Sequence, residues 1–379
     1  MQYKSKIKMS IKHTIAFFCR LLPLQKKIIC GNMGGRGMGD DPKHIACAIH
    51  EKNNVPIYWL VSKMDASSFP EWVKPIKIGS IASIYHICTA KIWISNARNM
   101  FIFKKREKQY YLQTWHSTLG IKKAEADTPT LPLSWQRASR NDSDKIDLAY
   151  ANNKIIYNFL RNSFWYYGPV IRIGQPRVAF LKKKYSESQM KVRNFFSIAN
   201  SKKIIMYAPT MRKHDNFDVF LYNYDKVKKC AEEKFGCDYV FMVRLHPIYT
   251  EKVSKLSLPD DIINATLYPD MEELLCASDI LISDFSSCMN DFSILKKPVF
   301  LFAKDYDDFI QNDRDFLIDI SILPYPISKT EEQLCCNIKS FDNTLYLKEC
   351  DNFFKEVDLI DDGNGDIEVA KIVLTHLEG

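Results

Sequence analysis

The sequence lacks the common signatures of metal, redox and dinucleotide sites. Its eleven cysteines include no CxxC pair and no HExxH segment occurs, so the usual zinc sites are not indicated. Its glycines match neither the GxGxxG fingerprint of dinucleotide-binding proteins nor a Walker loop. Cysteines scattered in this way are typical of reduced thiols in the core of a cytosolic protein. We therefore expect neither a metal nor a cofactor.

Three short DxD patterns remain as metal candidates. Only the middle one lies just past a predicted strand, and aspartates in that position more often cap a turn or a helix. We expect none of them to hold a metal. The three patterns are Asp142/Asp144, Asp305/Asp307 and Asp313/Asp315.

Acidic residues and long apolar runs are missing from the first 39 residues. Lysines and arginines alternate there with isoleucine, phenylalanine and leucine, but no run approaches the roughly 20 apolar residues that span a bilayer. No small-residue cleavage site follows, so a signal peptide is not indicated. Residues 1–25 fit two interpretations: a basic amphipathic segment lying on an anionic membrane, or an ordinary first helix whose lysines face water.

The composition is that of a globular protein with an excess of positive charge. The 379 residues are 46% hydrophobic and 26% charged, with a formal net charge of +8. The length suits two domains of ordinary size. The charge suggests anionic partners such as nucleic acid, phosphorylated metabolites or a membrane. Beyond the N-terminal segment the basic residues are mixed with acidic ones, which argues against a nucleic-acid-binding module.

Short apolar strands alternate with helical segments along the chain, in two series. This alternation predicts parallel sheets with helices on both faces, and thus two doubly wound Rossmann-like α/β domains facing across a cleft. A turn-rich linker at Gly174–Arg177 separates the series. We expect a membrane-facing segment at 1–25, an N-terminal domain at 26–175, a C-terminal domain at 176–345 and a helical tail at 346–379.

Two local predictions concern the N-terminal domain. The strand Lys26–Cys30 runs into a glycine-rich loop, after which Asp41 is expected as the N-cap of a helix with Pro42 in its first turn. The aromatic run Phe164–Val170 is expected to be a strand near the end of the domain. A flexible loop after a first strand commonly faces a ligand cleft.

Two histidines follow predicted strands, one in each domain. His116 comes directly after Tyr110–Trp115, and His246 follows Tyr239–Val243. The carboxyl ends of strands form the ligand crevice of open α/β sheets, so the two imidazoles are expected to face it. A histidine can take a proton from an attacking hydroxyl near neutral pH. A structural role for each remains the alternative.

The stretch Tyr268–Phe302 contains the most suggestive turn. The buried strand Ile280–Ser283 ends at Asp284, and Ser286 and Ser287 lie where the next helix opens. Free N–H groups and the helix dipole make such a turn suitable for an anionic group. The plainer interpretation is that Asp284 and Ser286 cap the helix.

Further polar residues surround this turn in the predicted fold. Arg212, which follows Thr210, and Arg244 lie at neighbouring strand ends and offer planar donors suited to phosphate. Either of Glu272 and Glu273 could bind ribose hydroxyls, or both could favour the start of their helix. The two arginines and the turn at Asp284, Ser286 and Ser287 are interpreted as a pyrophosphate pocket. A surface ion pair is the alternative for each arginine.

Five motifs in order resemble those of the CDP-glycerol glycerophosphotransferase family of teichoic acid and capsule synthesis. The resemblance covers the chain from about Gly31 to the final helix. Departures are Ser117 for glycine, Met211 for tryptophan, Phe285 for tyrosine and Ala179 for aspartate. The motifs are Gln113-Thr114-Trp115-His116 with Lys122-Lys123, Gly174-x-Pro176-Arg177, Tyr207-Ala208-Pro209-Thr210-x-Arg212, Arg244-Leu245-His246-Pro247 and Ser278–Ser287.

The resemblance implies a GT-B fold and transfer of glycerol phosphate from CDP-glycerol to a hydroxyl of a lipid-linked or capsule acceptor, with release of CMP. It implies action at the cytoplasmic face of the membrane, as a peripheral protein. By analogy His116 is the base and His246 a donor-phosphate ligand, and the Asp284, Ser286 and Ser287 turn holds the diphosphate.

Alternatives remain open. The donor is CDP-ribitol in relatives, and a GT-B glycosyltransferase using a nucleotide sugar would share the fold. A basic membrane-binding or nucleic-acid-binding module without catalysis is the alternative from another class. The sequence does not decide between priming and polymerising activity, nor does it identify the acceptor.

Overall fold

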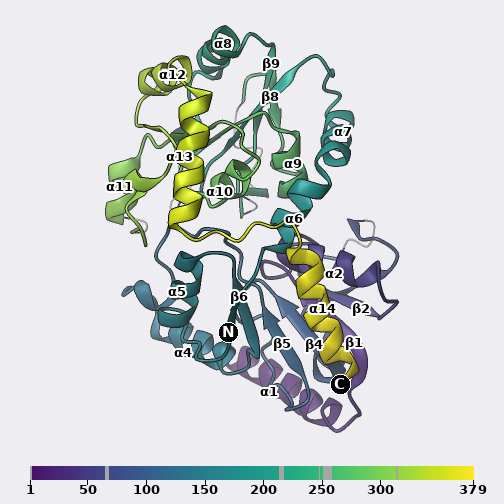
Figure 1. Cartoon of the computed structure of the whole chain (residues 1–379). Coiled ribbons are helices and arrows are strands. Elements are labelled where there is room, and N and C mark those ends of the chain that lie inside the picture. Colours follow the sequence, from purple (N-terminus) through teal and green to yellow (C-terminus); the bar gives the residue numbers. More distant parts are fainter. Residues whose placement is uncertain (1, 65–67, 213–216, 247, 251–257, 313–314) are drawn as a thin grey trace. The chain divides into compact units, whose positions relative to one another are not determined.

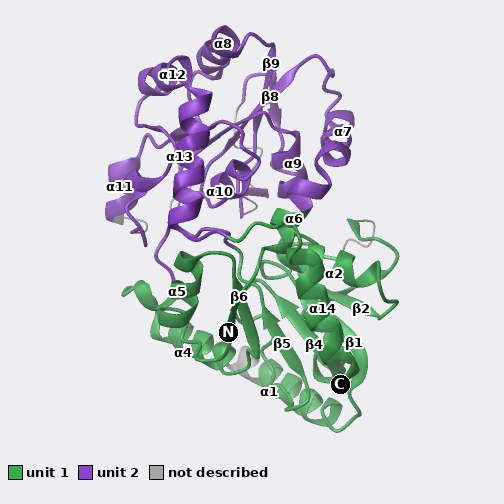
Figure 2. Cartoon of the chain, in the orientation of Figure 1, with its two compact units in different colours: residues 1–116, 125–179, 360–379 green, residues 117–124, 180–359 purple. Residues whose placement is uncertain are grey.

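The computed structural model describes residues 2–64, 68–212, 217–246, 248–250, 258–312 and 315–379 (Figure 1). Pro247 and Asp313, which entered the sequence motifs above, lie outside these residues. The chain forms two compact units (Figure 2). Unit 1 comprises residues 1–116, 125–179 and 360–379, and unit 2 comprises 117–124 and 180–359.

Unit 1 is built on a parallel sheet that has seven strands in the described part of the chain, in the order β3-β2-β1-β4-β5-β6-β7. Ile28, Ile29 and Cys30 of the first strand are fully buried. Such continuous apolar runs are typical of parallel strands that helices cover on both faces. The strands are β1 (Gln25–Gly31), β2 (Ile57–Val61), β3 (Val73–Lys77), β4 (Ala90–Ser95), β5 (Tyr110–Gln113), β6 (Leu148–Ala151) and β7 (Val170–Arg172).

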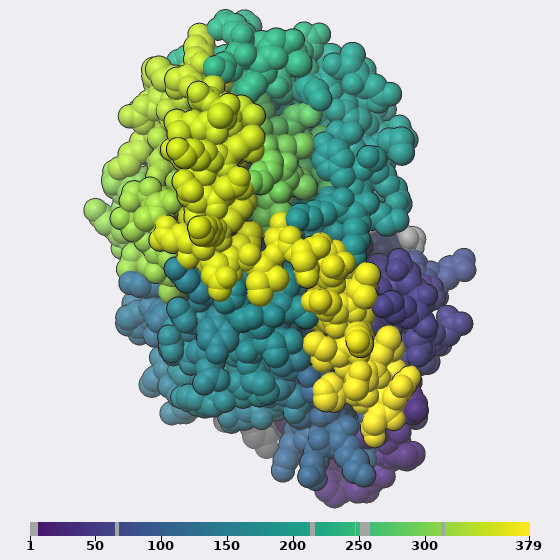
Figure 3. Space-filling model, viewed as in Figure 1, coloured from purple at the N-terminus to yellow at the C-terminus, as the bar shows by residue number. Residues whose placement is uncertain are grey.

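The final helix of the chain returns to this first sheet. Val369, Ala370 and Val373 share a core cluster with Ile45 and Ile49 of the helix after β1. Figure 3 shows the last two helices, in yellow, on the surface of the molecule. The helices of unit 1 are α1 (Gln2–Cys19), α2 (Asp40–His50), α3 (Ile81–Thr89), α4 (Leu133–Ser143), α5 (Lys154–Asn162) and α14 (Gly365–Glu378), and α6 (Pro176–Lys183) runs from unit 1 into unit 2.

Unit 2 has a second parallel sheet, with the order β10-β9-β8-β11-β12-β13 over the residues described. Its strands are β8 (Lys203–Ala208), β9 (Tyr239–Val243), β10 (Ile262–Asn264), β11 (Ile280–Ser283), β12 (Val299–Phe302) and β13 (Ile327–Ser328). Its helices are α7 (Tyr185–Phe195), α8 (Tyr224–Phe235), α9 (Met271–Ala277), α10 (Cys288–Ser293), α11 (Tyr306–Asn312), α12 (Glu331–Lys339) and α13 (Asn343–Glu356).

The prediction of two doubly wound α/β domains is confirmed, but the chain divides between them differently from the expected boundaries. The expected tail at 346–379 is split, because α13 belongs to unit 2 and α14 to unit 1. The segment 117–124, expected within the N-terminal domain, belongs to unit 2. Apolar burial against separate sheets, not order along the chain, sets these memberships.

Two local predictions are wrong. The aromatic run Phe164–Val170 is mostly irregular, and the strand begins only at Val170. Phe164 instead packs its ring under the Arg98 guanidinium, 3.3 Å from the ring centroid. The helix predicted to start after Asp41 begins at Asp40, with Gly39 as its N-cap and no side-chain capping bond.

Candidate active site

His116 is oriented by a backbone carbonyl. The chain leaves β5 through Trp115, which has a left-handed φ of 55°. Nδ1 of His116 lies 2.9 Å from the carbonyl oxygen of Asn96. A carbonyl oxygen only accepts hydrogen bonds, so Nδ1 carries the proton in the neutral ring and Nε2 carries the lone pair. Nε2 is thus the atom that can accept a proton from a hydroxyl.

His246 has the opposite tautomer. The residue follows β9, and its Nδ1 accepts a hydrogen bond of 3.2 Å from the backbone N–H of Ile248. Nδ1 must therefore carry a lone pair, which places the proton of the neutral ring on Nε2. An Nε2–H group is a donor suited to a phosphate oxygen, and it needs no positive charge for that.

Arg212 links the ends of two strands of the second sheet through carboxylates. Its Nε and Nη2 bind the Asp305 carboxylate at 2.6 and 2.8 Å, and Nη2 also binds Asp284 at 2.8 Å. Its Nη1 donates to the Thr210 carbonyl at 2.7 Å. Burial disfavours the charge, but Asp305 and Asp284 more than offset this and raise the pKa of Arg212. The Arg212 guanidinium, which we expected to face phosphate, instead stabilises the turn at Asp284 by binding Asp284 and Asp305.

The capping interpretation of Asp284 is not supported. Its carboxylate accepts from the backbone N–H groups of Thr210, at 2.7 Å, and Phe285. Helix α10 starts after Ser287, which makes no side-chain capping bond. Ser286 and Ser287 are both half-buried at this turn. Because α10 has only six residues, its dipole is small, and the two hydroxyls are the more substantial features of the turn.

The hydroxyl of Thr210 is buried, and none of the described residues gives its Oγ1 a hydrogen-bond partner. Buried hydroxyls are nearly always hydrogen-bonded, so the unpartnered Thr210 hydroxyl beside Asp284 is a candidate ligand contact. In the sequence, Thr210 was a site candidate only because it belongs to the motif Tyr207-Ala208-Pro209-Thr210-x-Arg212.

Arg244 and Glu273 bind groups of their own unit. Arg244 is buried, and its Nη1 donates to the carbonyls of Ala265, at 3.0 Å, and Thr266. Burial, partly offset by Asp270 and Glu272, lowers its pKa to about 10. Glu273 accepts from Tyr268 at 2.5 Å and from Lys191 at 2.6 Å.

Glu272 lies beside Glu273 in the first turn of α9 and is buried. Glu273 is bonded to Tyr268 and Lys191 in the same unit, and the ribose contact of either glutamate stays a prediction.

One tyrosine joins the His246 loop to the Arg212 loop. The hydroxyl of Tyr249 accepts from the Arg212 N–H at 2.9 Å, and its own N–H donates to the His246 carbonyl at 2.9 Å. The structure therefore brings His246, Thr210, Arg212 and Asp284 to the carboxyl ends of β9, β8 and β11. His116 lies at the corresponding edge of the sheet in unit 1.

The segment after His116 is fastened to α10. The Thr118 hydroxyl donates to the Asp291 carboxylate, and the Asn290 amide donates to the Leu119 carbonyl at 2.9 Å. The Leu317 N–H donates to the Ile121 carbonyl at 2.7 Å. We name residues 117–124 the strap. The strap follows His116 directly in the chain and is hydrogen-bonded to α10, the helix that begins after Ser287.

Sequence reasoning missed the roles of Asp40 and Asn96, which lie in a network that begins at His116. Asp40 accepts from the Asn96 side chain at 2.8 Å and from Arg177 at 2.7 Å. For Asp40 the signal in the sequence was its position at the end of the glycine-rich loop, next to the expected N-cap Asp41.

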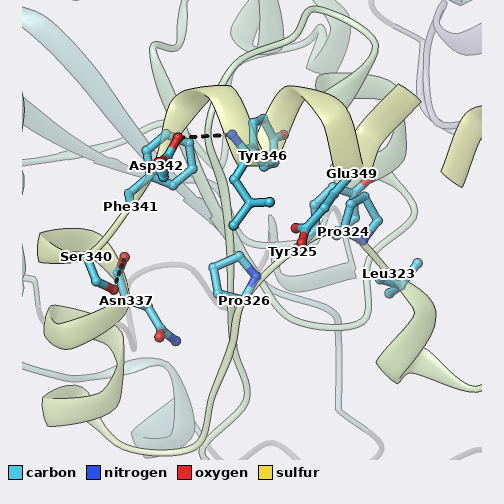
Figure 4. Close-up of a pocket in the computed structure, with 11 residues that line it drawn as sticks. Leu323, Pro324, Tyr325, Pro326, Asn337, Ser340, Phe341, Asp342, Tyr346 and Glu349 are labelled. Carbon is cyan, nitrogen blue, oxygen red and sulfur yellow. Dashed lines mark hydrogen bonds between the residues drawn. The ribbon is translucent and has the colours of Figure 1, made fainter. Parts of the chain in front are cut away.

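Other features of the described residues lie outside this site. A hollow between β13 and the helices α12 and α13 is lined by apolar residues such as Pro324, Pro326 and Phe341 and includes none of the predicted site residues (Figure 4). Within the described ranges, no group of three or more His, Cys, Asp and Glu side chains is arranged to hold a metal ion. Among the helices described, none has both the length and the apolarity needed to cross a membrane.

Comparison with known proteins gives concordant matches. Residues 14–375 match the family model of CDP-glycerol:poly(glycerophosphate) glycerophosphotransferase. The chain is 26% identical over 393 residues to a teichoic acid poly(glycerol phosphate) polymerase of Bacillus spizizenii, covering 98% of this chain and 100% of that protein. It is 27% identical to a polymerase of the same description from Staphylococcus epidermidis, covering 92% of this chain but only 50% of that longer protein.

A solved structure agrees with the sequence matches. The fold superposes with a TM-score of 0.84 on a variant of the wall teichoic acid polymerase TagF soaked with CDPG. The two are 25% identical, and the match covers 100% of this chain and 96% of that one.

Proposed function

Because the chain belongs to the CDP-glycerol:poly(glycerophosphate) glycerophosphotransferase family, we propose that it transfers glycerol phosphate from CDP-glycerol to a hydroxyl of a teichoic acid or related acceptor, releasing CMP. We assign His116 as the general base and His246 as a phosphate ligand because their neutral rings have opposite tautomers. One ring has its basic nitrogen at Nε2, as a general base requires. The other has its N–H there, as a phosphate ligand requires.

The proposed step is a displacement at the glycerol-bearing phosphorus. The acceptor hydroxyl gives its proton to Nε2 of His116, and its oxygen bonds to that phosphorus. The bond from phosphorus to the bridging oxygen breaks, and the electron pair leaves on the phosphate of CMP. Positioning and electrostatic stabilisation supply most of the catalysis in such reactions. His246 would donate to a phosphate oxygen throughout the step.

The donor diphosphate is proposed to lie against the turn at the end of β11. The orphan hydroxyl of Thr210 and the hydroxyls of Ser286 and Ser287 are its candidate donors. Arg212 with Asp284 and Asp305 carries a net charge of −1, so this cluster does not itself attract a phosphate. We assign Arg212 and Asp284 to holding the turn, and Arg244 to holding the loop before α9.

The test is release of CMP from CDP-glycerol in the presence of a defined acceptor. His116→Ala and His246→Ala are expected to lose at least 100-fold in turnover while keeping the wild-type melting temperature. Near-normal CMP release by either folded variant would refute the role of that histidine. Parallel reactions with CDP-ribitol and with UDP-sugars, analysed by mass spectrometry of the products, decide between the donors.

We further propose that the chain works at the cytoplasmic face of the membrane, held there by α1. Phe17 is 58% exposed and Phe18 62% exposed, and Leu21 just beyond the helix is 70% exposed. Lys8 and Lys12 lie on the same helix. Exposed aromatic rings on a helix that also carries lysines fit an interface with anionic lipid.

Sedimentation with vesicles tests this proposal. Phe17→Glu/Phe18→Glu is expected to lose binding to vesicles containing phosphatidylglycerol and to keep its activity on a soluble acceptor analogue. Unchanged sedimentation of the double variant would refute membrane binding through α1. Leu133→Glu, which replaces a residue 69% exposed on α4, is the matched control for a new surface charge.

A further inference from the structure

A buried network connects His116 to an aspartate that the proposed mechanism does not use. The Asn96 carbonyl binds Nδ1 of His116, and the Asn96 side chain donates to Oδ2 of Asp40 at 2.8 Å. Asn96 is fully buried. The backbone and the side chain of one residue therefore join the candidate base to a carboxylate.

The orientation of Asn96 is fixed at three points. Its Nδ2 donates to Asn32 at 2.7 Å as well as to Asp40, and its Oδ1 accepts from the Met33 N–H at 2.9 Å. A carboxylate only accepts, so Nδ2 must face Asp40, and the amide cannot be flipped without breaking all three bonds. A side chain held this firmly also fixes the carbonyl that orients His116.

The Asp40 carboxylate is held in its charged form. Oδ1 accepts from Arg177 at 2.7 Å and from the Asp41 N–H at 2.7 Å. Burial, the largest single influence, works against the charge. Arg177, the Asp41 N–H and the charge of His116 outweigh it and lower the pKa of Asp40.

The backbone at Asp40 is unusual as well. Its φ is +56°, a left-handed conformation that residues other than glycine adopt rarely and that aspartate tolerates better than most. Glycines are plentiful in this loop, yet the left-handed position at the helix start holds an aspartate. Its carboxylate makes contacts that a glycine could not.

We propose that Asp40 is a positioning residue for the candidate base, acting through Asn96 to fix the His116 ring and supplying the negative charge that stabilises its imidazolium. This rests on the proposed function of His116. When Nε2 takes the acceptor's proton, the ring becomes positive while Nδ1–H stays bound to Asn96. An anion nearby then favours the charged ring, which is the general logic of a base oriented by a third group.

Other ionisable groups face Asp40 and enter the pH argument. Arg177 at the start of α6 and Asp41 on α2 are in contact with the network, and Tyr150 of β6 donates to Asp41 at 3.1 Å. Burial and the charge of Asp40 raise the pKa of Asp41 to about 7, against the opposing effect of Arg177. Asp41 is bonded to Tyr150 and Arg177, and we expect it to influence His116 through its charge.

The test is the pH profile of kcat/KM for CMP release. Asp40→Asn keeps the size of the side chain and removes its charge. We expect turnover to fall about tenfold or more and the acid limb to move about one unit to lower pH, because an imidazolium without a neighbouring anion is the stronger acid. The KM for CDP-glycerol should stay within twofold. A lower turnover with an unmoved acid limb would overturn the proposal.

Asp40→Gly is a second variant, chosen because the backbone at this position is left-handed. Glycine adopts a φ of +56° without strain, so the loop is expected to keep its conformation. The same shift of the acid limb is expected. Asp40→Glu, which keeps a carboxylate, is expected to restore the position of the limb, though not all of the turnover.

A double-mutant cycle separates this inference from the proposed function. If Asp40 acts through His116, then Asp40→Asn costs less than twofold in turnover once His116 is alanine. A full further loss in that background would show an independent, merely structural role. If His116→Ala itself retains turnover, the proposed function fails first, whatever Asp40 does.

Discussion

Arg212 binds Asp305 through two separate nitrogens, across 93 residues of sequence. The same guanidinium reaches Asp284, so a single cation joins the ends of β8, β11 and β12. Removing one partner from such a buried set leaves an uncompensated charge, which typically costs about 3–5 kcal/mol. The geometry of the turn at Asp284 therefore depends on the planar, forked guanidinium of Arg212.

Arg212→Lys is therefore expected to be far from conservative. A single ammonium cannot span both carboxylates and the Thr210 carbonyl, so we expect a lower melting temperature and a CDP-glycerol KM raised tenfold or more. Thermal melts and CMP-release kinetics measure the two effects. Lys226→Gln, which breaks the exposed pair with Glu332, is the control and should change neither. Wild-type kinetics in Arg212→Lys would contradict the role given to the fork.

The orphan hydroxyl of Thr210 gives a second prediction. Thr210→Val keeps the shape and removes a buried polar atom without a partner among the described residues, so stability should not fall. The KM for CDP-glycerol should rise about tenfold if that hydroxyl binds the donor. Thr89→Val is the contrast, because the Thr89 hydroxyl is fully engaged by Lys27 and Tyr85. It should lower stability and leave the KM alone.

The strap gives a third prediction. Thr118→Val removes the donor to the buried Asp291 carboxylate and should lower stability by about 1–3 kcal/mol. Since Thr118 lies two residues after His116, turnover should fall more than the KM for the donor rises. Steady-state kinetics and urea unfolding check this. Equal changes in turnover and KM would show that the strap serves donor binding alone.

His86 gives a prediction about acid stability. Burial, together with Lys27 and Lys74, lowers its pKa to about 4, whereas the unfolded chain has the ordinary value near 6.5. Below pH 6.5 the unfolded state binds a proton that the folded state does not, so stability falls as the pH drops from about 6.5 to about 4.

His86→Phe should reduce that acid sensitivity. The ring stacks on Tyr58 with centroids 3.8 Å apart, and phenylalanine keeps this contact without the titrating group. Urea midpoints at pH 7.5 and 5.0 should lie closer together in the variant than in the wild type. His50→Phe, which replaces an imidazole stacked on Trp72, is the control and should keep the wild-type difference. An unchanged difference in His86→Phe would rule out the explanation.

The sheets were predictable because their strands are continuous apolar runs between polar turns, as at Ile280–Ser283, which the structure reproduces residue for residue. The final helix was predicted but its place was not. Its burial against α2 depends on Ile45 and Ile49, which no local pattern connects to Val369.

The candidate site was predictable to a similar degree. Strand ends located His116 in the first sheet, and His246 and Asp284 in the second, because the carboxyl ends of parallel strands lie at one edge of their own sheet. The partners were not predictable. Asp40 contacts Asn96 across 56 residues and Arg177 across 137, and Arg212 faces carboxylates where a phosphate was expected. Such pairings depend on side-chain packing, which no spacing in the sequence records.

The return of α14 to the first sheet has a consequence for synthesis. Residues 365–378 complete the core around α2, yet the ribosome makes them after all of unit 2. The first half of the nascent chain therefore waits with Ile45 and Ile49 uncovered while the second sheet is being translated. We therefore expect unit 1, whose first half emerges first, to complete its core only after residues 365–378 have been made.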